Sequence, residues 1–206
     1  SKKSNDFVYI GGAARFIRPD GGRAHLRAWG KHEELLEKVP HFRGEVFEDA
    51  YGNIYGRFEG KTKGECIRGV IQDGWEHFDR FKIPEIDPKY YGELKEKKLA
   101  EHEKFIVSPF PLSVFSVLRD ARLMDNALMD TAMEPENVAM FLDKICGRSL
   151  EIIEGLGGTG CDAVIMYDDW GTQDRTFISP DSFRELFKPA YKKIAAALHR
   201  NGLKFI

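Results

Sequence analysis

The sequence predicts an α/β protein with a parallel sheet, and three observations lead to that prediction. Short apolar runs typical of buried strands alternate with longer segments of helical periodicity in the second half of the chain. Strand, helix and strand follow in an order that favours parallel strands joined by right-handed crossovers. Apolar residues make up 42% of the 206 residues, enough for a substantial core.

Residues 1–94 are predicted to form a β-containing, turn-rich section that leads into the main sheet. Two aromatic-rich runs flank Gly52-Asn53, which is the pattern of a β-hairpin. The expected elements, in order, are a strand at 7–10, a turn at 18–23, a short helix at 31–40, the hairpin at 46–60, and a helix with a proline-bounded link at 68–88.

Residues 95–206 are predicted to form successive β/α units. Apolar residues recur every three or four positions through both central helical segments, and Ser179-Pro180 and Asn201-Gly202 are typical of a helix start and stop. The expected elements are strands at 105–107, 163–167 and 203–206, and helical regions at 111–130, 133–156 and 179–200.

The number of strands leaves the architecture open. A closed (β/α)₈ barrel takes about 250 residues. Only three clear β/α strands can be counted, and the last one ends the sequence. The residues therefore predict either a small open sheet or a piece of a larger barrel.

Composition excludes several classes of function. The 31 basic and 33 acidic residues are interspersed, which argues against nucleic acid or an anionic membrane as a partner. No apolar run is long enough to span a bilayer, and the N-terminal apolar patch is too short for a secretory signal. Three separated cysteines, with no CxxC pair, indicate reduced thiols. We therefore expect a cytoplasmic protein.

The glycine-rich segment GLGGTG, at 155–160, matches the letters of a dinucleotide-binding loop. That loop requires a strand before it and a helix after it, because the helix N-terminus faces the pyrophosphate. Here a predicted helix precedes and a predicted strand follows. The segment therefore indicates a helix end and a turn.

The candidate pocket residues lie at the carboxyl ends of two predicted strands, where α/β sheets bind ligands. After the strand at 163–167 come Asp168, Asp169, Trp170 and Gln173. Because side chains alternate along a strand, at most one aspartate points into a central pocket. The alternative is that one aspartate caps a turn and the other is solvated. A divalent cation bound with Asp174 is disfavoured, because the loop supplies too few oxygen ligands.

The other strand end, SPFPLSVF at 108–115, offers Phe110 and Phe115 for an apolar pocket wall and Ser108 as a hydrogen-bond donor. Simple strand termination before a helix explains the same residues equally well. The six histidines are isolated, and no GxSxG, Walker or HExxH motif is present. No catalytic residue is assigned from these patterns.

Residues 100–206 resemble the uroporphyrinogen decarboxylase superfamily. The resemblance rests on DDWGTQ at 168–173 and ISPxxFxxxxKPxY at 178–191. It is closest to the zinc-dependent, corrinoid-linked methyltransferases, which include methylcobalamin:coenzyme M methyltransferases and O-demethylase components. The resemblance implies a (β/α)₈ TIM barrel with its pocket at the carboxyl ends of the strands. This chain would then be an incomplete barrel, the N-terminal part only.

Two positions differ from the true decarboxylase. Phe115 stands where that enzyme has a tyrosine, and Asp169 stands where it has a serine. A phenyl ring cannot donate the hydrogen bond that a phenol gives to a substrate carboxylate. The arginine-rich RQAGRY element of the decarboxylase is also missing. Decarboxylation of a porphyrinogen is therefore disfavoured.

The methyltransferase branch binds zinc through a His-x-Cys element that follows a strand like 202–206, and through a later cysteine. The resemblance therefore implies zinc ligands beyond Ile206 and none within this segment. Zinc would activate a thiol or a methyl ether, and a corrinoid on a partner protein would carry the methyl group. Asp168, Asp169 and Gln173 would orient the substrate beside the metal.

We thus expect part of a methyltransferase that moves a methyl group between a small methylated substrate or thiol and a corrinoid protein, the segment alone being inactive. The alternatives are a uroporphyrinogen decarboxylase-like lyase and a non-catalytic small-molecule-binding protein. Unpaired strand edges also predict a homodimer.

Overall fold

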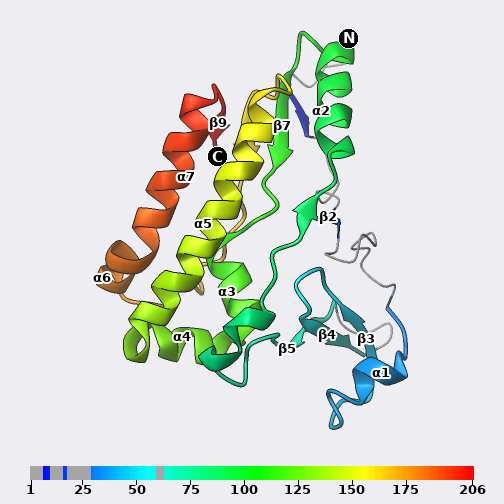
Figure 1. The fold of residues 1–206 in the computed structure, drawn as a ribbon, viewed down its shortest axis with the longest axis vertical. Helices are drawn as coiled ribbons and strands as arrows, with labels where there is room; N and C mark the ends of the chain where they lie inside the picture. The colour runs from blue at the N-terminus through cyan, green and yellow to red at the C-terminus, as the bar shows by residue number, and fades with distance from the viewer. Residues whose placement is uncertain (1–6, 10–15, 18–28, 59–62) are drawn as a thin grey trace. The chain divides into compact units, whose positions relative to one another are not determined.

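The computed structural model describes residues 7–9, 16–17, 29–58 and 63–206 (Figure 1). The turn expected at 18–23 lies outside the described residues. The elements are β1 (Phe7–Tyr9), β2 (Phe16–Ile17), α1 (Glu33–Leu36), β3 (Glu45–Glu48), β4 (Ile54–Arg57), β5 (Glu65–Arg68), the 3₁₀-helix η1 (Trp75–Arg80), β6 (Glu85–Ile86), α2 (Lys89–Ala100), β7 (Phe105–Pro109), α3 (Val114–Arg122), α4 (Met124–Met133), α5 (Pro135–Gly157), β8 (Ala163–Ile165), α6 (Pro180–Ser182), the π-helix η2 (Phe183–Phe187), α7 (Lys188–Arg200) and β9 (Lys204–Phe205).

The chain divides into two compact units. The first unit comprises residues 1–15, 86–115 and 139–206, and the second comprises residues 16–85 and 116–138. The division expected between residues 94 and 95 stays a prediction.

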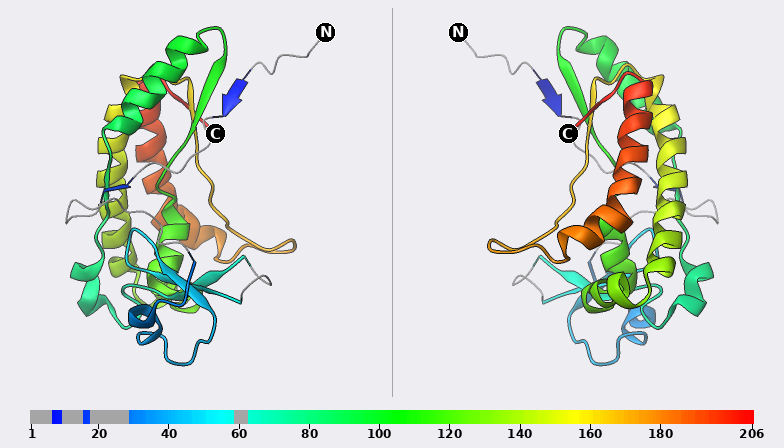
Figure 2. Two further views of the ribbon diagram at one scale, coloured as in Figure 1. Left: turned by 90° about the vertical axis from the view of Figure 1, so that its right-hand side faces the viewer. Right: turned by 90° about the vertical axis from the view of Figure 1, so that its left-hand side faces the viewer.

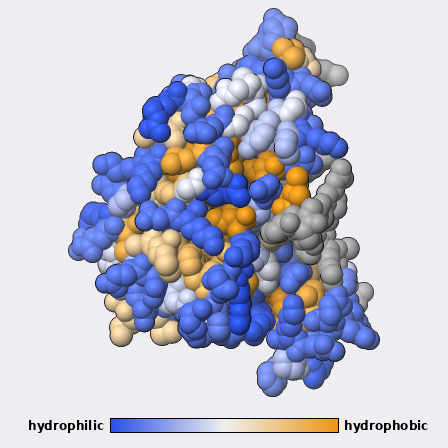
Figure 3. Space-filling model, in the orientation of Figure 1, coloured by the Kyte–Doolittle hydropathy of each residue, from blue (hydrophilic) through white to orange (hydrophobic). Residues whose placement is uncertain are grey.

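The first unit contains a parallel sheet in the order β1-β7-β8-β9. Val107 pairs with Ala163, and Ala163 in turn with Lys204. Figure 2 shows α2, α5 and α7 on the same side of these strands. The outward surfaces of the helices carry mainly hydrophilic side chains, with apolar ones between them (Figure 3). The prediction of parallel β/α units is confirmed.

The mixed α/β class is confirmed as well, but the described strands do not close into a barrel. The four strands of this sheet are consistent with part of a barrel wall, and the incomplete barrel itself stays a proposal. No helix in the described part of the chain is long and apolar enough to cross a membrane.

The helix that follows residue 179 starts as predicted. The Ser179 hydroxyl accepts a hydrogen bond from the Ser182 N–H, and Pro180 occupies the first helical position. One turn later the helix widens to the π-helix η2 before α7 begins. Pro189 has no N–H for the carbonyl four residues earlier, which favours such a widening. Gly202, at φ 74°, follows the end of α7.

The second unit contains the antiparallel sheet β3-β4-β5, which confirms the predicted hairpin. Leu35, Val46 and Ile54 form its buried core. Gly52 adopts φ 91° in the hairpin turn, a conformation that glycine tolerates best. β2 pairs with β6 in a separate two-stranded sheet.

The helical region at 111–130 is not continuous. Leu123 has φ 65° and separates α3 from α4. Arg122 lies before this break and Asp130 after it. The Arg122 Nε donates to Asp130 Oδ2 at 2.7 Å, and both side chains are buried. The regular apolar spacing predicted the helices correctly but gave no sign of the break, because the buried ion pair that spans it is a tertiary contact.

Candidate functional site at the carboxyl ends of β7 and β8

Side-chain alternation decides which residues of β7 point toward the helices. Ser108 pairs with Val164 in the neighbouring strand, and both are fully buried. The Ser108 hydroxyl lies 2.6 Å from the hydroxyl of Tyr90 on α2. Ser108 therefore faces the helical layer, where it is engaged with α2.

The two adjacent aspartates after β8 differ in their surroundings. Asp168 is half-buried, and its Oδ2 accepts hydrogen bonds from the Phe115 N–H at 2.9 Å and from the Tyr191 hydroxyl at 2.5 Å. Asp169 is exposed, and its Oδ1 accepts one long bond of 3.4 Å from the Gly171 N–H. Asp169 is the aspartate that remains available to solvent or a ligand.

Asp168 connects the loop after β8 to the first turn of α3 and to α7. Phe115 is the second residue of α3, so the carboxylate lies where the helix presents unbonded N–H groups and partial positive charge. Burial, and then the charge of Asp168, raise the pKa of Tyr191, so the phenol stays protonated and donates to the carboxylate. Asp168 is thus well placed to hold the local fold.

Trp170 lies at the centre of an aromatic cluster. Its ring stacks on Phe115 with centroids 4.5 Å apart, and it meets Phe183 and Phe187 edge to face at 5.0 and 4.8 Å. The indole N–H donates to the Tyr191 hydroxyl at 3.1 Å, which in turn donates to Asp168. The cluster fixes the loop after β8 against η2 and α7.

Sequence reasoning missed Phe183, Phe187 and Tyr191 as neighbours of the site. Their spacing of four residues places them on one face of a helix, which was a signal that could have found them. Two of them, Phe183 and Tyr191, are fixed positions of the ISPxxFxxxxKPxY pattern. The structure gives that pattern a physical meaning, because these residues contact Trp170.

A groove of about 480 Å³ lies beside this cluster. Trp170 and Phe183 give it apolar walls, and Lys188 adds positive charge. Arg184 also lines the groove and is paired with Asp181 at 2.7 Å. Such a lining suits a small molecule with an apolar body and an anionic group. The lining residues are Trp170, Thr176, Ile178, Ser179, Pro180, Phe183, Arg184 and Lys188.

The remaining predicted site residues lie elsewhere in this region. Phe110 and Phe115 are buried, and Phe110 donates its N–H to the Ile165 carbonyl at 2.7 Å. Gln173 is exposed at the tip of the loop after β8. The structure thus brings Phe115, Asp168 and Trp170 together, whereas of the predicted residues only Trp170 lines the groove.

The described residues do not fit a zinc site. No three His, Cys, Asp or Glu side chains within them are grouped to hold a metal ion. The thiols of Cys146 and Cys161 are buried and donate to the carbonyls of Ala190 and Ile106. Burial raises the pKa of both thiols, which disfavours the thiolate form that binds zinc.

The comparisons with known proteins cover part of the chain. The family model described as uroporphyrinogen decarboxylase (URO-D) matches residues 104–206. No curated protein matches the chain. Among solved structures, a methyltransferase from Methanosarcina mazei superposes with a TM-score of 0.51 at 17% sequence identity, over 71% of this chain. The chain covers 44% of the length of that protein.

Proposed function

Because the chain belongs to the uroporphyrinogen decarboxylase family, we propose that it is part of a methyltransferase that moves a methyl group between a small substrate or thiol and a corrinoid protein. Support for this branch comes from a fold shared with the Methanosarcina mazei methyltransferase. At 17% identity that likeness concerns the fold, so the reaction itself is the proposal.

The observation that carries the choice between methyl transfer and decarboxylation is the environment of Phe115. Its ring is fully buried and contacts the rings of Trp170 and Phe187. A phenyl ring in that place offers no hydrogen-bond donor to a substrate carboxylate. Phe115, at the position where the decarboxylase has a tyrosine, therefore packs in the aromatic cluster of this protein.

Asp169 and Gln173 are the side chains we propose to contact the substrate. Both are exposed in the loop that follows β8, at the end of the sheet where parallel α/β proteins bind ligands. The Gly171–Thr176 bridge and the bond from the Thr172 N–H to the Arg175 carbonyl hold this loop. Asp168 acts as a positioning residue, because its carboxylate holds α3 and α7.

Zinc and a corrinoid are also part of the proposal. Zinc would supply Lewis-acid activation of the methyl donor or acceptor, with ligands from residues of a longer protein outside these 206. The corrinoid would be carried by a partner protein.

The test is a methyl-transfer assay on the full-length protein with zinc and a corrinoid protein. We expect methyl transfer and no decarboxylation of uroporphyrinogen. Asp169→Asn should lower kcat/KM at least about tenfold, because one lost substrate contact corresponds to about 1.4 kcal/mol. Asp174→Asn, at an exposed aspartate of the same loop, is the matched control and should leave the rate unchanged. Decarboxylation without methyl transfer would reverse the assignment, and substrate binding with neither reaction would favour the non-catalytic alternative.

We also propose self-association through the sheet edges. β1 and β9 are the outermost strands of the described parallel sheet, and each has a neighbour on one side. Open strand edges pair readily with another chain. Size-exclusion chromatography of this chain should show a dimer, and a monomer at micromolar concentration would refute the proposal.

A further inference from the structure

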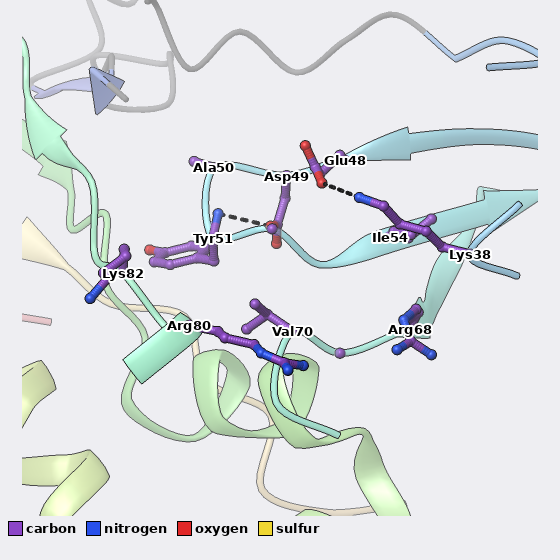
Figure 4. A pocket seen from close by; sticks show the side chains of 12 residues that line it. Lys38, Glu48, Asp49, Ala50, Tyr51, Ile54, Arg68, Val70, Arg80 and Lys82 are labelled. Carbon is purple, nitrogen blue, oxygen red and sulfur yellow. Dashed lines mark hydrogen bonds and ion pairs between the residues drawn. The ribbon is translucent and has the colours of Figure 1, made fainter. Parts of the chain in front are cut away.

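A second pocket, of about 360 Å³, lies in the second unit (Figure 4). It forms where the turn between β3 and β4 meets the segments at 68–70 and 80–82. Its side chains are unusually rich in cations for a chain whose net charge is −2. The lining residues are Lys38, Glu48, Asp49, Ala50, Tyr51, Gly52, Ile54, Arg68, Gly69, Val70, Arg80 and Lys82.

The two acidic residues of the lining are already engaged by protein groups. Glu48 pairs with Lys38 at 3.6 Å. Asp49 accepts hydrogen bonds from the N–H groups of Tyr51 and Asn53, at 2.9 and 2.8 Å, and from the Asn53 amide at 2.9 Å. Burial raises the pKa of Asp49 to about 6, which reduces its negative charge further near that pH. These carboxylates therefore do little to neutralise the remaining cations.

Arg80 and Lys82 are the two cations of the lining that have no acidic partner among the residues that the structure describes. Both are exposed, and the described part of the chain gives neither of them a hydrogen bond or an ion pair. Arg68, another basic residue of the lining, pairs with Asp73 at 2.8 Å. Figure 4 shows Arg80 extending beneath Val70 toward Arg68. The pocket thus has an excess of positive charge at Arg80 and Lys82.

Tyr51 adds an apolar wall and an unsatisfied polar atom. Its ring stacks on Phe81, with centroids 5.9 Å apart and planes 14° from parallel. Its hydroxyl is buried and has no hydrogen-bond partner in the described residues. Burial raises the pKa of this phenol, so it stays protonated and can donate. Figure 4 shows the hydroxyl at the end of the pocket where Lys82 projects.

A buried polar atom without a partner is costly and rare in proteins. An oxygen of a ligand at the inner end of the pocket would satisfy the Tyr51 hydroxyl, and the same negative group would neutralise Lys82 and Arg80. A cationic ligand would be repelled, and an uncharged one would leave both charges without a partner.

We propose that this pocket binds a small organic molecule with a doubly charged oxyanion group, either a phosphate or a pair of carboxylates, next to a short apolar or ring portion. Arg80 and Lys82 bind the oxyanion, the Tyr51 hydroxyl donates to it, and the Tyr51 ring and Val70 contact the apolar portion. This site uses other residues than the proposed methyl-transfer site, and its test does not depend on methyl transfer.

Isothermal titration calorimetry on the intact chain tests the proposal with three probes. Phenyl phosphate and phthalate represent the two sources of oxyanion, and benzamide is an uncharged ring of similar size. We expect saturable binding of at least one of the two anions with 1:1 stoichiometry and none of benzamide. The anion that binds more tightly identifies the natural ligand as a phosphate ester or a dicarboxylate.

Variants then assign the contacts. Arg80→Gln and Lys82→Gln should each weaken binding about tenfold, since each removes one charge-assisted contact. Lys31→Gln removes an exposed cation outside the pocket and should change the affinity less than about twofold. Tyr51→Phe should weaken binding and raise the thermal midpoint of the ligand-free chain, because it deletes the unsatisfied hydroxyl.

Three outcomes would overturn the inference. The first is that neither anion saturates the chain. The second is that the Arg80→Gln and Lys82→Gln variants bind as tightly as Lys31→Gln does, which would indicate diffuse electrostatic attraction. The third is that Tyr51→Phe changes neither the affinity nor the thermal midpoint, which would show that the Tyr51 hydroxyl does not contact the ligand.

Discussion

Asp168→Ala is expected to destabilise the first unit strongly, although an equal substitution at the next residue is expected to do almost nothing. The Asp168 carboxylate accepts hydrogen bonds from the Phe115 N–H and from the Tyr191 hydroxyl. Phe115 is fully buried, so its N–H would be left without an acceptor. Asp169 is exposed, and within the described part of the chain it accepts one hydrogen bond, of 3.4 Å.

The magnitude follows from the two contacts. A hydrogen bond to a charged group contributes about 1.5–3 kcal/mol, and a buried donor left unpaired costs about 1–3 kcal/mol. Because Asp168 is only half-buried and the two bonds share one oxygen, we take the lower end and expect a loss of about 3 kcal/mol for Asp168→Ala. Asp168→Asn keeps an acceptor but loses the charge, so we expect about half of that loss.

The assay is urea unfolding followed by circular dichroism. If the unfolding free energy falls by about 2 kcal/mol per M of urea, a loss of about 3 kcal/mol lowers the urea concentration at the unfolding midpoint by roughly 1.5 M. Asp169→Ala is the control and should stay within about 0.5 kcal/mol of the unchanged chain. Tyr191→Phe combined with Asp168→Ala should lose less than the sum of the single losses, by about 1 kcal/mol, because the two side chains share a bond.

Equal midpoints for Asp168→Ala and Asp169→Ala would refute this reasoning. Strict additivity of Asp168→Ala and Tyr191→Phe would show that the bond between the two side chains contributes nothing to stability.

Three further predictions concern the second unit and α2. Burial raises the pKa of Asp49 to about 6, so the folded chain holds that proton more tightly than the unfolded chain does. The stability that this contributes, up to about 3 kcal/mol, is present below about pH 4 and is lost as the pH rises through 6. The unfolding free energy of the Asp49→Asn variant, measured over the same pH range, should lack that decline. Asp130→Ala leaves the Arg122 guanidinium buried without its partner and should cost about 3–5 kcal/mol in urea unfolding, a prediction that a loss below 1 kcal/mol would contradict. Gly92→Ala, in α2 with nothing within 4 Å of the new methyl group, should raise the unfolding free energy by about 0.5–1 kcal/mol. In Gly69→Ala the methyl group would meet a backbone oxygen at 2.3 Å, so this variant should lower the unfolding free energy by about 1–3 kcal/mol. Both are measured by thermal unfolding, and a similar change in the two variants would contradict the packing argument.

The sequence by itself determined the local elements of this protein. The apolar spacing over 133–156 predicted α5, Ser179-Pro180 predicted the start of the C-terminal helical region, and Gly52-Asn53 predicted the hairpin. The order of strands and helices predicted parallel pairing in the first unit. Each of these features depends on residues close together in the chain, so a pattern over a few positions is enough to specify it.

Only the tertiary structure decided how these elements use their side chains. Asp168 and Asp169 are neighbours in the sequence with the same chemistry, yet one is bonded to α3 and α7 and the other is exposed. Likewise, the Tyr51 hydroxyl is an ordinary phenol in the sequence, whereas in the fold it is buried and has no hydrogen-bond partner among the described residues. The physical reason is that burial and hydrogen bonding of a side chain depend on partners tens of residues away, and their positions are set by packing of the whole unit.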